Sequence, residues 1–226
     1  MSRLRPLALA ALVASTVFAF TACTTAPAPA DTADTAPTSL VAADGIVLGD
    51  GPIAIELWTD TSCPHCALLD EATGDDIAAW VTDGTITLTI HPMNYVSTKR
   101  GDTTDYSTRA ANLLALTADA GELDAVLPLY TLLQANQVDA DGAPTDADLL
   151  EFAAEAGVTA DLTAGVEGRT MAEWVQESND HWLGKIVGSE SAVDHVPLLV
   201  VDGETFDIRE DGTDGERLRD AVTAAG

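Results

Sequence analysis

Two cysteines three positions apart are the residues of this chain best suited to chemistry, and they lie in Cys63-Pro64-His65-Cys66. Thiols at this spacing can close one disulfide, exchange it with another molecule, or bind a metal ion. The apolar run Ile53–Trp58 before them is typical of a strand, and Ala67–Glu71 after them is typical of a helix. The first sulfur then lies at a helix N-terminus, where free backbone N–H groups and the helix macrodipole favour a thiolate. Pro64 suits the first helical position, because the N–H group that it lacks would have no helical partner.

Metal binding is the main alternative for this motif, and counting ligands argues against it. A structural zinc site needs four ligands, usually a second Cys pair or a closely spaced His pair. The chain has no second Cys pair, and no histidine pair has ligand spacing among His65, His91, His181 and His195. Covalent haem attachment needs a histidine directly after the second cysteine, where this chain has Ala67. The sequence therefore favours a redox dithiol over zinc, with no metal and no cofactor.

The N-terminus predicts export from the cytoplasm. Arg3 and Arg5 precede the apolar stretch Leu7–Phe20, which is too short to span a bilayer comfortably and is typical of a signal peptide. Phe20-Thr21-Ala22-Cys23 resembles the bacterial lipobox, which implies a signal peptide over residues 1–22 and acylation of Cys23. The alternative is an ordinary secretory signal that leaves Cys23 free. An unpaired exposed thiol is a liability in an oxidising compartment, so we favour a lipid anchor on the outer face of the membrane.

Composition divides and limits the remaining chain. Residues 23–43 are dominated by Thr, Ala, Pro and Asp, which predicts a disordered tether. Residues 44–226 are long enough for one domain with a good core. The formal net charge of the whole chain is −27, with 10 basic and 37 acidic side chains. Because nucleic-acid binding needs a basic surface, this charge argues against it.

The flanks of the domain alternate between strand and helix patterns, which predicts an α/β fold. We expect strands at 45–49, 53–58 and 85–90, with helices at 64–71 and 75–82 between the last two. Such alternation predicts that strands 53–58 and 85–90 pair in parallel. Near the C-terminus, 196–201 and 205–208 flank the turn Asp202-Gly203, which predicts a hairpin followed by a helix at 217–225.

The middle of the chain, about 102–191, contains no convincing strand and is expected to be helical. Helices are predicted over 106–120 and over 122–134, where Pro128 implies a kink or a break. Thr145 has the character of an N-cap, with Asp148 three residues later, for a helix over 147–156. A longer helix is predicted over 171–187.

This order of elements resembles the thioredoxin fold with an inserted helical subdomain at about 102–191, and more narrowly the DsbA family of extracytoplasmic disulfide oxidoreductases. The residues that carry the resemblance are Trp58 to Cys66, the lead-in Gly49-Asp50-Gly51-Pro52, and Val196-Pro197 followed by Val201-Asp202-Gly203. The Pro-His dipeptide between the cysteines is the one found in strongly oxidising members of that family.

The resemblance implies a role for each matching position. Cys63 is expected to be the exposed nucleophile that forms a mixed disulfide, and Cys66 the buried resolving thiol. Pro64 and His65 are expected to tune the reactive thiol. Pro197 is expected to be a cis-proline facing the dithiol, and the backbone of Val196 to pair with an extended substrate.

One departure from the family concerns proton transfer. Relatives often bury an acid six residues before the first active cysteine, where this chain has Leu57. Glu56 lies one residue earlier, and strand alternation directs it to the opposite face, where we expect it to be solvated. The group that relays protons to Cys66 is therefore left open.

The resulting hypothesis is a monomeric enzyme that oxidises dithiols of secreted or membrane proteins and is reset by a membrane reoxidant. It would contact the membrane only through its lipid anchor. Alternatives are a disulfide reductase or isomerase on the same fold, and a non-catalytic chaperone or copper-binding module. For copper, Met93 is the nearby ligand candidate, whereas Met171 lies in a predicted helix.

Overall fold

Six strands form the central sheet in the computed structural model, which describes residues 41–42, 45–140 and 142–226. The strand order is β1-β2-β4-β3-β7-β8. The strands are β1 (Val41–Ala42), β2 (Gly45–Leu48), β3 (Ile53–Thr59), β4 (Ile86–Pro92), β7 (Leu198–Val201) and β8 (Glu204–Thr205). The predicted signal peptide, Cys23 and most of the predicted tether lie outside the described residues. Within the part of the chain that is described, no helix has the length and apolar character needed to cross a membrane.

The centre of the sheet confirms the parallel pairing expected between the first two long strands. β3 runs parallel to β4, with Trp58 opposite His91. On its other side β3 pairs antiparallel with β7, with Trp58 opposite Leu198. The end of β3 therefore lies beside the start of β7. This register brings the residues that follow Trp58 close to those that precede Leu198, although about 140 residues separate them in the chain.

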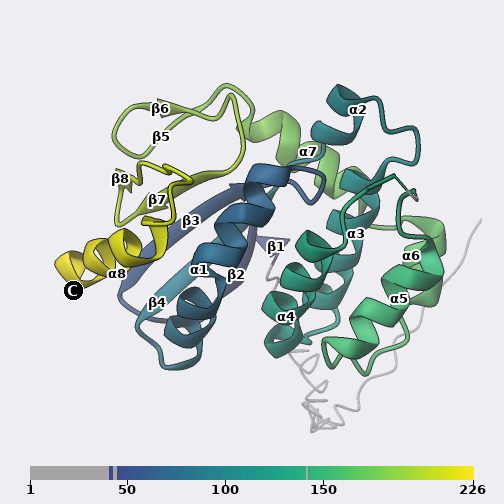
Figure 1. Ribbon diagram of the computed structural model, residues 1–226. Coiled ribbons are helices and arrows are strands. Elements are labelled where there is room, and N and C mark those ends of the chain that lie inside the picture. The colour runs from purple at the N-terminus through teal and green to yellow at the C-terminus, as the bar shows by residue number, and fades with distance from the viewer. Residues whose placement is uncertain (1–40, 43–44, 141) are drawn as a thin grey trace, which may run out of the picture. The chain divides into compact units, whose positions relative to one another are not determined.

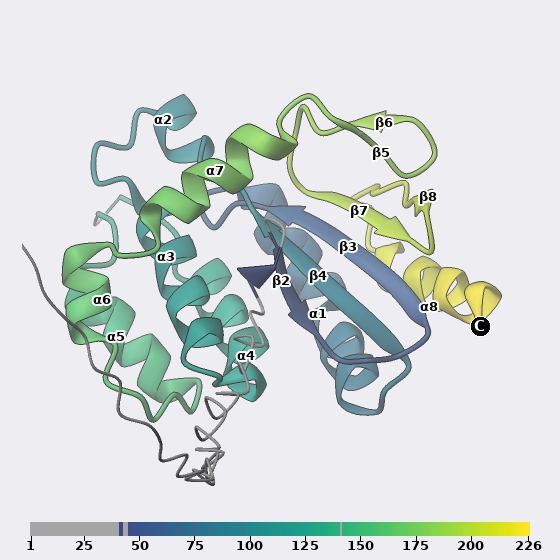
Figure 2. The same ribbon diagram turned by 180° about the vertical axis from the view of Figure 1, so that it is seen from behind.

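Helix α1 (Pro64–Thr82) covers one face of the sheet, and α8 (Asp214–Ala225) packs beside it (Figure 1). The covered face is apolar because alternate residues of the strands point toward α1. This core includes Ile55, Leu57, Leu88, Ile90, Leu69 and Ile77. The opposite face of the sheet is turned toward the viewer in Figure 2. Strand alternation directs the other set of side chains to this face, among them Glu56 and Thr89.

Two helices were expected where the structure has only α1, so this prediction was wrong. Gly74 lies in the middle of α1 and does not interrupt it. A Cβ atom at this position would lie 2.8 Å from Asp70 Oδ1, one helical turn earlier. The glycine therefore makes room for a neighbouring carboxylate instead of ending the helix, although it costs the helix about 1 kcal/mol relative to alanine.

The inserted segment is helical, and one of its helices packs against α1. Helix α4 lies beside α1 in Figure 1, with α3 and α5 beyond it, and α7 crosses near one end of β3 and β4 in Figure 2. The bounds are α2 (Val96–Arg100), α3 (Tyr106–Asp119), α4 (Leu123–Ala135), α5 (Asp146–Glu155), α6 (Thr163–Gly168) and α7 (Ala172–Trp182).

Some predictions for the insert hold, and others fail. Thr145 caps α5 as expected, since its side chain accepts a hydrogen bond from the Asp148 N–H and Asp148 bonds back to Thr145. Pro128 does not break α4, which continues through it. The helix expected to reach Val187 ends at Trp182, and the following residues form a short hairpin of β5 (Ile186–Val187) and β6 (Ser191–Ala192).

The C-terminal hairpin is confirmed, with a shorter second strand than expected. β7 and β8 pair antiparallel through the turn Asp202-Gly203, whose φ angles are 48° and 84°. Positive φ at both positions is what a two-residue hairpin turn with the twist of its strands requires. Residues 23–43 were expected to be disordered. Within this range, however, Val41–Ala42 form β1 and pair with the start of β2.

Candidate active site

Cys63 forms the N-cap of α1, so its sulfur lies where the helix has unpaired backbone N–H groups. Its backbone is extended (φ −93°, ψ 116°), and Pro64 opens the helix. The Cys63 carbonyl accepts hydrogen bonds from the N–H groups of Cys66 (3.0 Å) and Ala67 (3.2 Å). This first turn holds Cys66 directly behind Cys63, on the side of the helix that faces the core.

Both cysteines are free thiols, and Cys63 is more covered than expected. Cys66 is 1% exposed, as its resolving role implies. Cys63 is only 5% exposed, so the expectation of an exposed nucleophile was wrong for this conformation. The reason is that Cys63 Sγ packs against the loop before β7, where it donates to the carbonyl oxygen of Val196 at 3.3 Å.

The surroundings of the two sulfurs shift their pKa values in opposite directions. The pKa of Cys63 is lowered to about 6, first by the hydrogen bond from the Cys66 thiol, then by the N–H groups of Cys66 and His65 and the charge of His65. The pKa of Cys66 is raised well above its ordinary value, first by burial and then by the neighbouring Cys63 sulfur. One thiol of the pair is therefore ionised near neutral pH, while the other keeps its proton.

The loop before β7 faces this dithiol and forms one wall of a groove. The Val196–Pro197 peptide bond is cis, as the resemblance implied. A groove of about 520 Å³ runs from this loop past His65. It is lined by His65, Ser191, His195, Val196, Pro197, Leu198, Thr205, Phe206, Asp207, Ile208 and Glu210. An extended chain lying here would pass beside the dithiol.

Glu210 is a site residue that the sequence did not reveal. Its carboxylate oxygens lie 2.8 and 2.9 Å from His65 Nδ1, although the two residues are 145 positions apart. This hydrogen bond raises the pKa of His65 and so favours the imidazolium form beside Cys63. No local pattern in the sequence links the two residues, since the contact exists only because the segment after β8 folds back to α1.

Asp60, three residues before Cys63, anchors the loop between β3 and α1. It is 1% exposed, and its carboxylate accepts hydrogen bonds from Ser62 N (2.9 Å), Val96 N (2.9 Å) and Ser107 Oγ (2.6 Å). All three donors are neutral. Burial raises the pKa of Asp60 to about 6. The carboxylate thus ties the active-site loop to α2 and α3 at an electrostatic cost.

A chain of polar side chains runs from the dithiol into the insert. Gln137 donates to the Cys63 carbonyl (2.9 Å) and to Gln134 Oε1 (2.8 Å). Gln134 donates in turn to Thr59 Oγ1 (3.3 Å), which lies 2.6 Å from the hydroxyl of Tyr130 on α4. Thr59 also hydrogen-bonds the Cys66 sulfur, which lowers the pKa of Cys66 against the larger effect of burial.

Glu56 and Leu57 lie on opposite faces of β3, as alternation predicts. Glu56 points away from α1, with a side chain 40% exposed and 3.3 Å from His91 Nε2. His91 stacks on Trp58, with ring centroids 4.6 Å apart, and Trp182 contacts both rings. Leu57 faces α1, so the position where the resemblance implied an acid is apolar here.

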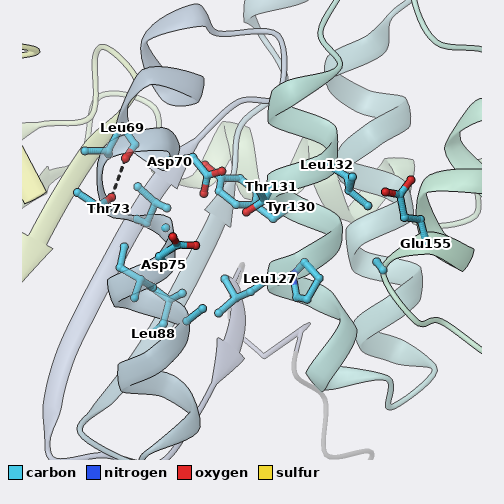
Figure 3. Close-up of a pocket in the computed structure, with 16 residues that line it drawn as sticks. Leu69, Asp70, Thr73, Asp75, Leu88, Leu127, Tyr130, Thr131, Leu132 and Glu155 are labelled. Carbon is cyan, nitrogen blue, oxygen red and sulfur yellow. Dashed lines mark hydrogen bonds between the residues drawn. The ribbon is translucent and has the colours of Figure 1, made fainter.

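Leu57 borders a cavity of about 380 Å³ between α1 and α4, shown in Figure 3. Its wall is mainly apolar, but Asp70, Thr131 and Tyr130 contribute polar groups that converge in the figure. Burial raises the pKa of Asp70 to about 6, against the effect of a hydrogen bond from Thr131. A partly buried carboxyl group is therefore present on this side of the sheet, although it comes from α1.

The structure brings most of the sequence-predicted site residues together. Pro64, His65, Val196 and Pro197 all lie around the two thiols. Met93 is fully buried and belongs to the same apolar cluster as both cysteines, whereas Met171 lies at the start of α7. Cys23 lies outside the described residues.

Sequence comparison agrees with the fold. Residues 43–222 match the model of a family described as thioredoxin. A search of the curated proteins found no match.

The chain is also similar to solved structures of thiol-disulfide oxidoreductases. MdbA from Corynebacterium diphtheriae shares 24% identity at a TM-score of 0.63, over 80% of this chain and 91% of that one. MdbA from Actinomyces oris shares 18% at 0.61, over 80% and 85%. DsbA from Mycobacterium tuberculosis shares 15% at 0.58, over 81% and 100%. At these identities the likeness establishes an α/β thioredoxin-like fold with inserted helices.

Proposed function

Because this chain belongs to the thioredoxin family, we propose that it is a thiol-disulfide oxidoreductase that oxidises dithiols of secreted proteins outside the cytoplasm. The observation that carries this proposal is the opposite shift of the two thiols. The pKa of Cys63 is lowered to about 6, while burial raises that of Cys66. Such a pair has one good attacking and leaving group and one protected resolving group.

The reaction begins with the Cys63–Cys66 disulfide. A substrate thiolate attacks Cys63 Sγ, forming a mixed disulfide and releasing Cys66 as a thiolate, which takes up a proton. The second thiolate of the substrate then attacks the other substrate sulfur, which is bonded to Cys63 Sγ in the mixed disulfide. The substrate disulfide forms, and Cys63 is released as a thiolate. The substrate loses two electrons, and the enzyme pair gains them.

The acidity of Cys63 favours this direction. Stabilising the thiolate stabilises the reduced enzyme, and so makes its disulfide a stronger oxidant. Lowering a thiol pKa from ~8.5 to about 6 is worth about 1.5 units at pH 7, or about 2 kcal/mol. For a two-electron couple this corresponds to roughly 45 mV.

Location and partners form part of the same proposal. The apolar stretch Leu7–Phe20 and the lipobox-like end at Cys23 support export and lipid anchoring on the outer face of the membrane. Substrates would be reduced secreted or membrane proteins, and a membrane reoxidant would restore the disulfide. Our reason to favour oxidation over reduction or isomerisation is the low pKa of Cys63.

The reduction potential tests the proposal. We expect equilibration with glutathione to give a value at least 50 mV above the roughly −270 mV of thioredoxin. We also expect Cys66→Ser to accumulate a mixed disulfide with a disulfide-bonded peptide, because its Cys63 thiolate attacks the peptide disulfide and the resolving thiol is lost. Cys63→Ser should form no such adduct, and it serves as the matched control. A potential at or below that of thioredoxin would reject the oxidase assignment, and no exchange at all would reject the whole proposal.

A further inference from the structure

Cys66 must exchange a proton in every catalytic cycle, yet bulk water does not reach it. Its side chain is 1% exposed, and burial raises its pKa well above the ordinary value. A thiolate released at this position is unstable until it is protonated. Leu57, the strand position where the resemblance implied an acid, carries no proton. The proton donor must therefore come from another element.

Asp70 is placed for this task by the geometry of α1. It lies four residues after Cys66, so the two side chains occupy the same face of the helix, one turn apart. Gly74 lies one turn further along that face. The Asp70 carboxylate extends over Gly74, where a Cβ atom would approach Oδ1 to 2.8 Å. Glycine at position 74 thus leaves space for this carboxylate, but it makes the helix less stable than alanine would.

The hydroxyl groups of Thr59 and Tyr130 connect Cys66 with the surroundings of Asp70. Thr59 hydrogen-bonds the Cys66 sulfur, and its Oγ1 lies 2.6 Å from Tyr130 OH. Tyr130 lines the cavity that Asp70 also lines, and Figure 3 shows their side chains side by side. The charges of Cys66 and Asp70 both raise the pKa of Tyr130, after the larger effect of its burial.

We propose that Asp70 supplies the proton to the departing Cys66 sulfur, acting through Thr59, Tyr130 and water in the cavity between α1 and α4. This inference rests on the proposed function, since it specifies how that reaction handles its proton. The cavity, at about 380 Å³, is large enough for water, and the groups from Asp70, Tyr130 and Thr131 can hold it.

The proton balance is complete in both directions. When a substrate thiolate attacks Cys63, the Cys63–Cys66 bond breaks and Cys66 leaves with the electron pair. The Asp70 carboxylic acid then gives up its proton through the relay, so that Cys66 becomes a thiol and Asp70 a carboxylate. In the reverse reaction the Asp70 carboxylate accepts the proton as Cys66 attacks the mixed disulfide.

The environment of Asp70 suits this exchange. Burial raises its pKa to about 6, so a useful fraction holds a proton near neutral pH. The charged or titratable groups around it are Asp75 on the same helix, Tyr130 on α4, Glu155 on α5 and Cys66 itself. None of these groups is a cation that would hold Asp70 permanently ionised.

Asp60 is a second acid with a raised pKa near the dithiol, and its contacts favour a different role. Its two oxygens already accept three hydrogen bonds, from Ser62, Val96 and Ser107. It does not line the cavity between α1 and α4. Protonating it would disturb the loop that positions Cys63, so we assign it to holding that loop.

The test is the pH dependence of disulfide reduction in the oxidised full-length protein. Tryptophan fluorescence follows the reaction with a small dithiol from pH 5 to 8. Each measured rate is divided by the concentration of the thiolate form of the dithiol. We expect the rate of the parent protein to fall about tenfold with an inflection near 6. Asp70→Asn should lose this inflection and react about tenfold more slowly at pH 5, and Asp70→Glu should restore the inflection. Glu155→Gln, which removes the same charge from the rim of the cavity, should leave the profile unchanged.

These outcomes separate the inference from the proposed function. A parent protein that exchanges disulfides, with an identical pH profile in Asp70→Asn, would overturn the role of Asp70 alone. A parent protein without exchange would overturn the proposed function. Denaturant unfolding of oxidised Asp70→Asn at pH 7 checks folding, and should show stability equal to or above that of the parent, because a partly buried charge is removed.

Discussion

At the scale of single residues, the pKa of Cys63 depends on His65, whose own pKa is raised by the distant residue Glu210. His65 lies in the turn that carries Cys63, and its charge lowers the pKa of Cys63. Glu210 bonds His65 Nδ1 and raises the pKa of His65. The segment after β8 thereby influences the sulfur without touching it.

Replacing Glu210 by glutamine tests this influence. We expect Glu210→Gln to bring the pKa of His65 back toward its ordinary value, so that less imidazolium is present at pH 7. The pKa of Cys63 should rise by a few tenths of a unit, a small change because the His65 side chain is 61% exposed and solvent screens its charge. Ultraviolet absorbance of the thiolate measures the Cys63 pKa, and NMR measures that of His65.

A control variant that also removes one carboxylate charge can be made in β8, the strand that precedes Glu210. Glu204→Gln removes an exposed carboxylate from β8 and should leave both pKa values in place. A lower or unchanged Cys63 pKa in Glu210→Gln, with the His65 pKa reduced, would show that the imidazolium does not stabilise the thiolate.

At the scale of elements, α1 carries most of the proposed chemistry along one face. Cys63 caps the helix, Cys66 lies in the first turn, Asp70 in the second and Gly74 in the third. Gly74 is poor for helix stability, but it leaves space for the Asp70 carboxylate. The sequence of this helix therefore balances its own stability against the position of one acid.

A substitution at Gly74 separates these two effects. Gly74→Ala should raise the free energy of unfolding by up to about 1 kcal/mol, since alanine is the better helix former. The new methyl group should displace the Asp70 side chain and shift or weaken the inflection in the pH profile of disulfide reduction. Denaturant unfolding and the rate profile measure the two effects.

The matched control is Ala79→Gly on the exposed face of α1. It should lower the stability by about 1 kcal/mol and leave the pH profile unchanged. Loss of stability in Gly74→Ala, or an unchanged profile, would contradict the account of Gly74.

The elements that the sequence predicted well are those with local signals. The capping box at Thr145, the turn Asp202-Gly203 and the strand before Cys63 each lie within a few residues of the pattern that indicates them. The continuity of α1 could not be predicted in this way, because Gly74 is tolerated for the sake of Asp70. The end of α7 at Trp182 was missed as well, since the apolar residues beyond it pair as β5 with β6.

The site was predictable where residues are close in sequence, or where a resemblance supplied the distant partner. Cys63 and Cys66 are of the first kind, and Pro197 is of the second. Glu210 and Tyr130 belong to neither, because only packing brings them to His65 and Thr59. Asp70 had a usable signal, its four-residue spacing from Cys66, but that signal becomes informative only once α1 is known to be continuous.

At the scale of the whole molecule, acidic groups dominate its response to pH. The chain has a net charge of −27, and two of its carboxyl groups, the buried Asp60 and the partly buried Asp70, have raised pKa values. Each carboxyl binds a proton more tightly in the folded than in the unfolded state. Their stabilising effect is fully present below their ordinary pKa and is lost as the pH rises through about 6.

The oxidised protein should therefore be more stable at pH 5 than at pH 7. Oxidation removes the thiols from the titration, and the two carboxyls together should add on the order of 2 kcal/mol to the free energy of unfolding. Below about pH 4 this gain should end, because the unfolded state then takes up protons more readily than the folded state at carboxyls such as Asp102, whose pKa the fold lowers to about 2. Denaturant unfolding across this range measures the effect, and a stability that falls steadily from pH 7 to 5 would contradict it.

The single uninterrupted helix behind the dithiol has a mechanical consequence. Backbone hydrogen bonds fix the rise between a sulfur and a carboxyl that share one helical face, so the two ends of the proton route keep a constant separation. Helices other than α4, which carries Tyr130, can shift to admit partners of different shapes without altering the route. Recognition and proton delivery can therefore diverge independently as such proteins evolve.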